Sequence, residues 1–267
     1  MLYPFLIVIV TAALLVARKA KPAGNKIGNN VMALPAIESE PTQLKVATYN
    51  IQTGKDLNGR RNLKASAEVI VDADLVGIQE VYAPSLANLA GIGVSQTEKL
   101  ARFGKFGWLF CATRRRWLRE HRGNAILSKL PIHNWQVEML SDQSGKSYRN
   151  MTTAQVYWQG ETFHFINTHL HTREGREEQL AEVLQEFAKY PRAILLGDFN
   201  SRLTTPALAH ALKDIDITDA ISTANLDLNN SERIDWILTK GFAVEGGKML
   251  EKGVSDHPYY QVTLSYK

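Results

Sequence analysis

The sequence has very little cysteine and no cluster of metal-binding thiols. Cys111 is the single cysteine among 267 residues, so no disulfide can form within one chain. The absence of a CxxC motif or a Cys/His cluster excludes a zinc site of the thiolate type. Cys111 directly follows the apolar run 108–110, and this setting predicts a buried structural thiol rather than a nucleophile.

Charged side chains are absent from residues 1–17, which consist mainly of Leu, Ile, Val and Ala. As a helix this run would be about 25 Å long, at the short end of what a bilayer requires. A cleaved signal peptide would need a basic start and a small residue three positions before the cut. The run has no basic start, and cutting after Ala17 or Ala20 would place Leu15 or Arg18 at that position.

We therefore predict that residues 1–17 form an uncleaved, single-pass membrane anchor, with export after signal cleavage as the alternative. Residues 18–43 begin with a basic flank and continue with Gly, Asn and Pro, which is typical of a linker. The basic flank favours the cytoplasmic face for the domain that follows, residues 44–267.

The rest of the composition is that of a folded domain with an anionic partner. Hydrophobic residues make up 45% of the chain, enough to bury a core, and charged residues make up 22%. The net charge is +4 and the sequence pI is about 9.0, which suits nucleic acid or a membrane surface.

Short apolar runs, many of them ending in polar residues, predict a protein with more strands than helices. The predicted strands are 44–49, 75–79, 108–112, 125–127, 152–158, 162–167, 193–196, 233–238 and 259–264. The predicted helices are 63–71, 97–103, 176–190 and 206–213. Helices occur at intervals rather than after every strand, which favours two sheets packed face to face with helices outside.

Polar residues stand at the ends of several predicted strands, where a rigid scaffold can hold a site. They are Asn50, Glu80, Asn167–His169, Asp198–Asn200, Asp235 within its strand, and Ser255–His257 before the last strand. Each alone is typical of a turn or a helix cap, but the six together indicate an active site.

As an ordered set, these motifs resemble those of the endonuclease/exonuclease/phosphatase superfamily, which has the DNase I-like fold. The motifs are Tyr49-Asn50, Gln79-Glu80, Gly123–Ser128, Thr168–Leu170, Gly197–Asn200, Arg233–Leu238 and Ser255–His257. The resemblance implies a four-layer α/β sandwich with two mixed sheets and the site at one end. It also implies that Glu80, Asp256 and Asn50 form a metal site, for which oxygen ligands suit Mg²⁺, with Mn²⁺ as the alternative.

The resemblance assigns the remaining roles to five residues. Asp198 would orient or deprotonate the attacking water, and Asn200 would hydrogen-bond a phosphoryl oxygen. His257 would contact the phosphate while Asp235 holds its tautomer, and His169 would be a second donor to the phosphoryl group.

Two arginines are weaker candidates for contacts with the substrate phosphate. Arg149 precedes a predicted strand at a position where members of the family place a phosphate-binding arginine. Arg122 ends a basic stretch, residues 114–122, that can follow a nucleic-acid backbone or face anionic lipid headgroups. For both arginines a solvated loop position is the alternative.

The sequence therefore predicts a metal-dependent phosphoesterase that acts by direct attack of water. A DNA/RNA endonuclease is the alternative, and a binding module that has lost catalysis ranks low because all motif residues are present. The expected partner is a phosphate ester, whether nucleic acid, phospholipid headgroup or small molecule, together with the membrane through the N-terminal segment. No obligate protein partner is expected.

Overall fold

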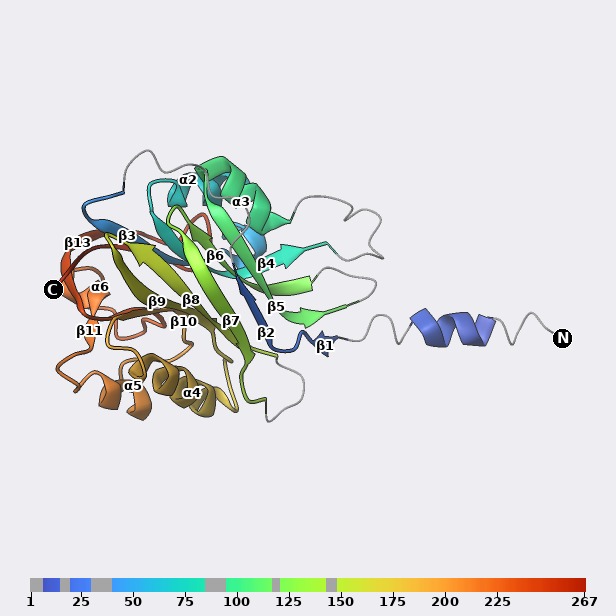
Figure 1. Ribbon diagram of the computed structural model, residues 1–267. Helices are drawn as coiled ribbons and strands as arrows, with labels where there is room; N and C mark the ends of the chain where they lie inside the picture. Colours follow the sequence, from blue (N-terminus) through green and yellow to red (C-terminus); the bar gives the residue numbers. More distant parts are fainter. Residues whose placement is uncertain (1–6, 15–19, 30–39, 85–94, 117–120, 143–147) are drawn as a thin grey trace.

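A computed structural model describes residues 7–14, 20–29, 40–84, 95–116, 121–142 and 148–267. They form two mixed seven-stranded sheets with helices outside, so the predicted four-layer α/β sandwich is confirmed (Figure 1). The first sheet has the order β1-β5-β6-β4-β3-β14-β13, in which only β3 and β4 are parallel. Its strands are β1 (Lys21–Pro22), β5 (Gly107–Arg115), β6 (His121–Ser128), β4 (Leu75–Ala83), β3 (Leu44–Asn50), β14 (Tyr259–Tyr266) and β13 (Phe242–Leu250).

The second sheet has the order β11-β12-β10-β9-β8-β7-β2, in which only β9 and β10 are parallel. Its strands are β11 (Thr218–Asp219), β12 (Asp235–Lys240), β10 (Ala193–Asp198), β9 (Glu161–His169), β8 (Asn150–Trp158), β7 (Ile132–Met139) and β2 (Lys26–Asn29). In both sheets the parallel pair is central, which places several strand ends at one edge of the sandwich.

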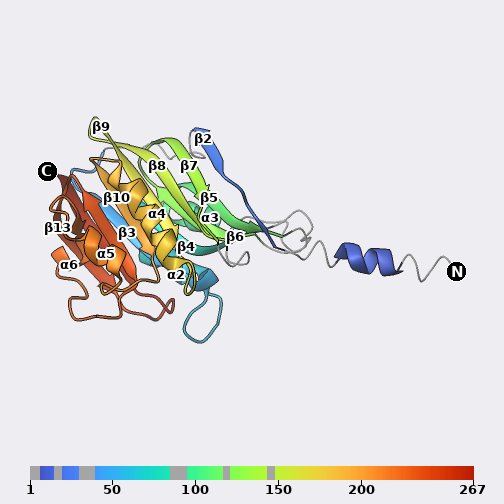
Figure 2. The ribbon, with the colours of Figure 1, turned by 90° about the horizontal axis from the view of Figure 1, so that it is seen from below.

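Three apolar layers hold the sandwich together, and the strands supply them by alternation. In β10, Ile194 and Leu196 point between the sheets, whereas Leu195 points outward to the helices. The outer face of the first sheet packs on α2 (Leu63–Ile70) and α3 (Gln96–Gly104). The outer face of the second packs on α4 (Arg176–Ala188) and α5 (Pro206–Ala211), as seen from below in Figure 2.

Most predicted elements are present, and the strands that the sequence did not reveal lie largely at sheet edges. β7 and β13 were missed because both contain many polar residues that are exposed or half-buried. β13 also contains two glycines, and its pairing with β14 is irregular between Val244 and Gly246. Two short elements, β11 and α6 (Ala220–Thr223), were also missed. Cys111 is 2% exposed, which confirms the predicted buried thiol, and burial raises its pKa to about 12.

The N-terminal segment contributes to the domain in a way that the sequence did not suggest. Within the predicted linker, residues 18–43, β1 pairs with β5 and forms one edge of the first sheet, and β2 pairs with β7 and forms one edge of the second. Residues 7–14 form a helix with exposed side chains. Among the described residues, no helix has both the length and the apolar character needed to cross a bilayer. The predicted anchor, residues 1–17, lies partly outside the described residues and stays a prediction.

Candidate active site

Three polar residues stand in one row across the second sheet. Asp198 is the last residue of β10, and its register partners are His169 on the parallel strand β9 and Asp235 on the antiparallel strand β12. All three are at most 3% exposed. Gly197 allows this row to form, since a Cβ there would lie 1.9 Å from the carbonyl oxygen of Thr168. The strand register therefore brings together residues that are far apart in the sequence.

His257 completes the row from the loop before β14. Its Nδ1 lies 2.8 Å from Asp235 Oδ2, which is the pairing that the sequence predicted. Burial alone would lower the pKa of His257, but the hydrogen bond and charge of Asp235, helped by Asp198 and Asp256, raise it to about 9. Imidazolium is therefore the favoured form at neutral pH.

Asp198 is the most extensively contacted carboxylate of the site. Its Oδ2 accepts a hydrogen bond from Asn50 Nδ2 at 3.0 Å and lies 3.3 Å from His169 Nε2 and 3.7 Å from His257 Nε2. Its other oxygen accepts the backbone N–H of Asn200 at 3.0 Å. Burial, together with the charge of Asp235, raises the pKa of Asp198 to about 7, so this carboxylate is poised to exchange a proton near neutral pH.

His169 differs from His257 in its charge state. Burial, followed by the charges of Arg149 and His257, lowers its pKa well below the usual value. The neutral ring directs Nε2 to Asp198, whereas the sequence suggested that His169 would donate to the substrate. Its first role in this structure is to hold Asp198.

Two asparagines also show roles more specific than the sequence implied. Asn50 Oδ1 accepts the backbone N–H of Gln52 at 3.0 Å, and its Nδ2 faces Asp198 and His257. Asn50 therefore contacts Asp198 through its amide nitrogen, while its Oδ1, predicted to lie at the metal, already accepts one hydrogen bond. Asn200 has a φ of +48° and donates one N–H of its amide to Leu170 O at 3.0 Å, which leaves its second N–H for another acceptor.

The carboxylates predicted to hold a metal come from the first sheet and its neighbouring loop. Glu80 has a φ of +60° at an irregularity in the β4–β6 pairing, and such bulges re-aim a side chain. Asp256 Oδ2 accepts a hydrogen bond from Gln52 Nε2 at 2.8 Å. Gln52 carries a buried Oε1 without a hydrogen-bond partner, so another polar oxygen faces this region. Gln52 was not among the residues predicted from the sequence, although it follows Asn50 of the Tyr49-Asn50 motif by two positions.

The donor set suits a hard divalent cation. Four carboxylates, those of Glu80, Asp198, Asp235 and Asp256, belong to the site, and Asp235 Oδ1 is buried without a partner. Asp198, Asp235 and His257 also offer ligand atoms within 4.8 Å of one another, a second arrangement able to hold an ion. His257 already pairs with Asp235, and the ligands Glu80 and Asp256 implied by the resemblance stay a prediction.

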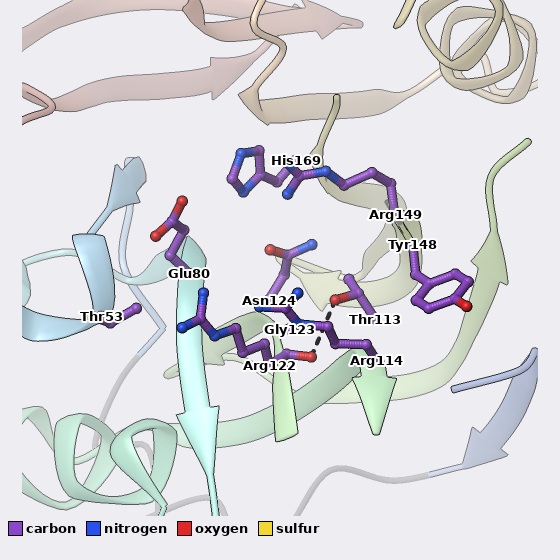
Figure 3. A pocket seen from close by; sticks show the side chains of 10 residues that line it. All are labelled: Thr53, Glu80, Thr113, Arg114, Arg122, Gly123, Asn124, Tyr148, Arg149 and His169. Carbon is purple, nitrogen blue, oxygen red and sulfur yellow. Dashed lines mark hydrogen bonds between the residues drawn. The ribbon is translucent and has the colours of Figure 1, made fainter. Parts of the chain in front are cut away.

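A pocket next to this centre contains both predicted phosphate-binding arginines. It is lined by Thr53, Glu80, Thr113, Arg114, Arg122, Gly123, Asn124, Tyr148, Arg149 and His169 (Figure 3). The guanidinium of Arg149 ends beside His169, whereas Arg114 and Arg122 lie on the opposite side, on β5 and β6. From the sequence, Arg114 was predicted only to belong to a basic stretch. The pairing of β5 with β6 places it in the wall of the pocket, and this pairing is not visible in the sequence.

Buried amides join the two sheets below the site. Gln79 Nε2 donates to Asn167 Oδ1 at 2.8 Å, and Asn167 Nδ2 donates to Ala125 O at 2.8 Å. These bonds connect β4 and β6 of the first sheet to β9 of the second. They fix the two halves of the site relative to each other.

The chain matches the endonuclease/exonuclease/phosphatase family over residues 47–257, and it belongs to this family. Its members are hydrolases of phosphate esters. No curated protein sequence matches the chain.

Solved structures share the fold at low sequence identity. An endonuclease/exonuclease/phosphatase from Beutenbergia cavernae has a TM-score of 0.69 and 22% identity, and the match covers 85% of this chain and 72% of the Beutenbergia chain. A mannosyl-6-phosphatase from Bacteroides thetaiotaomicron has a TM-score of 0.63 and 21% identity, and the match covers 84% of this chain and 100% of the phosphatase chain. The catalytic domain of human Nocturnin with bound sulfate has a TM-score of 0.65 and 16% identity, and the match covers 91% of this chain and 98% of the Nocturnin chain.

Proposed function

We propose that this protein is a divalent-metal-dependent phosphoesterase that hydrolyses its substrate by direct attack of water. The observation that carries the proposal is the contact network of Asp198. One buried carboxylate lies within 3.7 Å of Asn50, His169 and His257, and His257 is itself paired with Asp235. Such a set can hold a water molecule, donate to a phosphoryl oxygen and keep both groups in register.

A bound Mg²⁺ or Mn²⁺, held by Glu80 and Asp256 with Asn50 adjacent, would neutralise the phosphoryl oxygens and stabilise the leaving oxygen. The chain's own residues supply the rest of the chemistry. Asp198 Oδ2 accepts a proton from the attacking water. His257, charged and fixed by Asp235, donates from Nε2 to a phosphoryl oxygen, where negative charge grows in the transition state.

Neutral and cationic donors surround the same phosphoryl group. The second amide N–H of Asn200 hydrogen-bonds a phosphoryl oxygen without changing the net charge. Arg149 has no hydrogen bond or ion pair to its guanidinium among the described residues, and its Nε is buried. A buried cation without a partner is costly, so an anionic substrate group would compensate it. We assign Arg149 to the phosphoryl group that is attacked.

The substrate is best identified with a panel that separates the candidate classes. Full-length protein is assayed with plasmid DNA, RNA, sphingomyelin, inositol phosphates, alkyl phosphates and bis-p-nitrophenyl phosphate, each with Mg²⁺, with Mn²⁺ and with EDTA. We expect hydrolysis of at least one phosphate ester that stops in EDTA. Cleavage of plasmid DNA above all other substrates would select the endonuclease alternative.

The metal requirement is tested with one variant at a predicted metal ligand and one matched control variant. Glu80→Gln removes a ligand charge at nearly constant shape, so the metal concentration for half-maximal rate should rise at least tenfold, in line with a lost ligand. Glu161→Gln makes the same change on the exposed start of β9 and should leave that concentration unchanged. Undiminished turnover in excess chelator would show that the metal mechanism is wrong.

A further inference from the structure

The two N-terminal strands form a strap, residues 21–29, that joins the edges of the two sheets. β1 is an edge strand of the first sheet, β2 is an edge strand of the second, and only residues 23–25 separate them. The backbone N–H of Ala23 donates to Thr113 O at 3.1 Å, and Asn25 Oδ1 accepts the backbone N–H of Met139 at 2.8 Å. The strap is therefore fixed to both sheets.

The strap runs along the rim of the active-site pocket. In the pairing of β1 with β5, Pro22 is the register partner of Arg114, which lines the pocket, and Lys21 is the partner of Arg115. The chain that precedes β1 therefore starts from this rim. Leu14, the last described residue of the N-terminal helix, is seven positions before Lys21, so it lies within about 25 Å of the rim.

Basic side chains gather where the strap meets β5. Lys21, Lys26 and Arg115 are all exposed. Lys21 and Arg115 are directly opposite each other in the strand pair, and like charges in this arrangement destabilise a sheet. Burial, followed by the charge of Arg115, lowers the pKa of Lys26, so these two cations also act on each other. An anionic surface would relieve the repulsion among the three side chains.

The helix of residues 7–14 is apolar around its whole circumference. Its large apolar side chains are 45–66% exposed, and they are those of Ile7, Val8, Ile9, Val10 and Leu14. The helix stands apart from the sandwich in both views (Figures 1 and 2). Its only side-chain hydroxyl, Thr11 Oγ1, donates to Ile7 O at 2.7 Å and so is satisfied within the helix.

These features favour lipid over a protein partner for this helix. A groove on a protein covers one face of an amphipathic helix, whereas a helix that is apolar on every side needs apolar surroundings on every side. Lipid provides such surroundings, provided that the polar groups of the helix are satisfied internally. The basic side chains of the strap, at the rim from which this segment starts, match the anionic headgroups of a bilayer.

We propose that Lys21, Lys26 and Arg115 form a docking surface for an anionic lipid bilayer, and that the helix of residues 7–14 enters the lipid beside it, so that the active-site pocket opens at the membrane. Eight helical residues span about 12 Å, which is enough to enter the bilayer, and docking does not require them to cross it. The helix supplies most of the affinity, and the docking surface fixes the orientation of the domain. This docking does not depend on the proposed phosphoesterase function.

Lysine acetylation of the full-length wild type tests the orientation. The protein is acetylated alone and with phosphatidylcholine vesicles that contain about one third phosphatidylserine, and the rate at each lysine is read by mass spectrometry. The vesicles should slow acetylation of Lys21 and Lys26 severalfold. Lys189 and Lys267 are exposed at the other end of the sandwich and should keep their rates. Unchanged rates at Lys21 and Lys26, or equal protection of all four lysines, would overturn the proposal.

Two full-length variants test the docking surface itself. The docking variant changes its three basic residues to Gln. The control variant carries Lys189→Gln, Lys240→Gln and Lys267→Gln, which removes three charges from a hollow at the end of the second sheet opposite Asp198. Affinity for vesicles with and without phosphatidylserine is measured by co-sedimentation at low and high salt.

The expected difference between the variants follows from the number of charges at the surface. One basic residue near an anionic membrane contributes about fivefold in affinity. The docking variant should therefore lose about ten- to a hundredfold of the affinity that phosphatidylserine adds for wild type at low salt, and the control variant should keep it. Equal losses in both variants would show that total charge, not a surface, is responsible, and would overturn the proposal.

Two controls keep the result unambiguous. Thermal unfolding shows whether the docking variant is folded, and if its Tm falls, the acetylation pattern of wild type decides. Duplex DNA in place of vesicles tests the other anionic surface, and stronger protection of Lys21 and Lys26 by DNA would assign the surface to nucleic acid and overturn the membrane assignment. Neither measurement uses turnover, so docking can hold or fail independently of phosphate-ester hydrolysis.

Discussion

On the β9–β10–β12 side of the active site, the buried polar side chains hydrogen-bond to one another. Asp198, Asp235 and His257 are joined by contacts of 2.8 to 3.7 Å. On the β5–β6 side, the charged groups of the pocket include Arg114, to which no described residue gives a hydrogen bond or ion pair. Both sides belong to one sandwich, whose sheets are connected by buried amides.

The comparison separates two tasks that one pocket must perform. Catalysis requires groups whose positions and proton affinities are fixed before substrate arrives, and mutual hydrogen bonds fix them. Recognition requires groups whose partner is the substrate itself, and these remain uncompensated until it binds. We therefore expect substitutions on the first side to lower kcat, and substitutions on the second side to change which substrate is preferred.

The strongest test of the catalytic side is the His257–Asp235 pair. Asp235→Asn keeps the shape but removes the charge that holds imidazolium, so kcat should fall about 10²–10⁴-fold while the fold stands. His257→Ala should be similarly impaired, and the double variant should be no worse than the single ones, because residues acting as a unit are not additive. Rates are measured at saturating substrate, and folding is checked by thermal unfolding.

His210→Ala on α5 is the control for that pair, because His210 is exposed and is not part of the row formed by His169, Asp198 and Asp235. Its kcat should equal that of wild type. Effects that multiply in the double variant would show that His257 and Asp235 act independently.

Arg149 lies where the two sides meet, and its variants sharpen the comparison. Arg149→Gln should lower kcat/KM about ten- to a hundredfold for every phosphate ester that wild type hydrolyses, because the proposed contact is with the phosphoryl group that all substrates share. Arg149→Lys keeps the charge without the fork and should recover only part of the loss. An unchanged kcat/KM in Arg149→Gln would show that Arg149 does not contact the phosphoryl group.

The smallest effects are expected from the N-terminal residues, which belong to neither side. A chain that starts at residue 20 keeps β1 and β2, so its turnover on a soluble substrate and its Tm should match the full chain. A chain that starts at residue 40 loses both strands and uncovers Trp135, whose ring lies against Gly28. Its Tm should fall by at least about 2–4 °C, and its tryptophan emission should shift to longer wavelength.

The full-length chain and the chain that starts at residue 20 also test the predicted membrane anchor. Full-length protein should fractionate with membranes, whereas the chain from residue 20 should be released. Full-length protein found in the soluble fraction at its native size contradicts the anchor. A mature N-terminus near Ala20 indicates signal cleavage instead.

Prediction from sequence worked best where a residue sits at the end of a central, buried strand. Central strands are apolar on both faces, so their limits and the polar residues that end them are visible in the sequence, as for Gly197–Asn200. Prediction failed at the edge strand β13 and at β7, which lies next to the edge strand β2. Both contain exposed polar residues, and β13 also contains glycine. It also failed for Gln52 and Arg114, which belong to no strand-end motif.

The sequence by itself determined the fold class, the family and the buried thiol, because these follow from apolar patterning and from short, ordered motifs. Only the tertiary structure decided how the motif residues are used. Strand register placed Asp198 between His169 and Asp235, and packing turned Asn50 and His169 toward that carboxylate. Strand pairing likewise converted a basic run into the arginine-lined wall of a pocket. Such contacts depend on distances between segments far apart in the chain, and no local pattern encodes those distances.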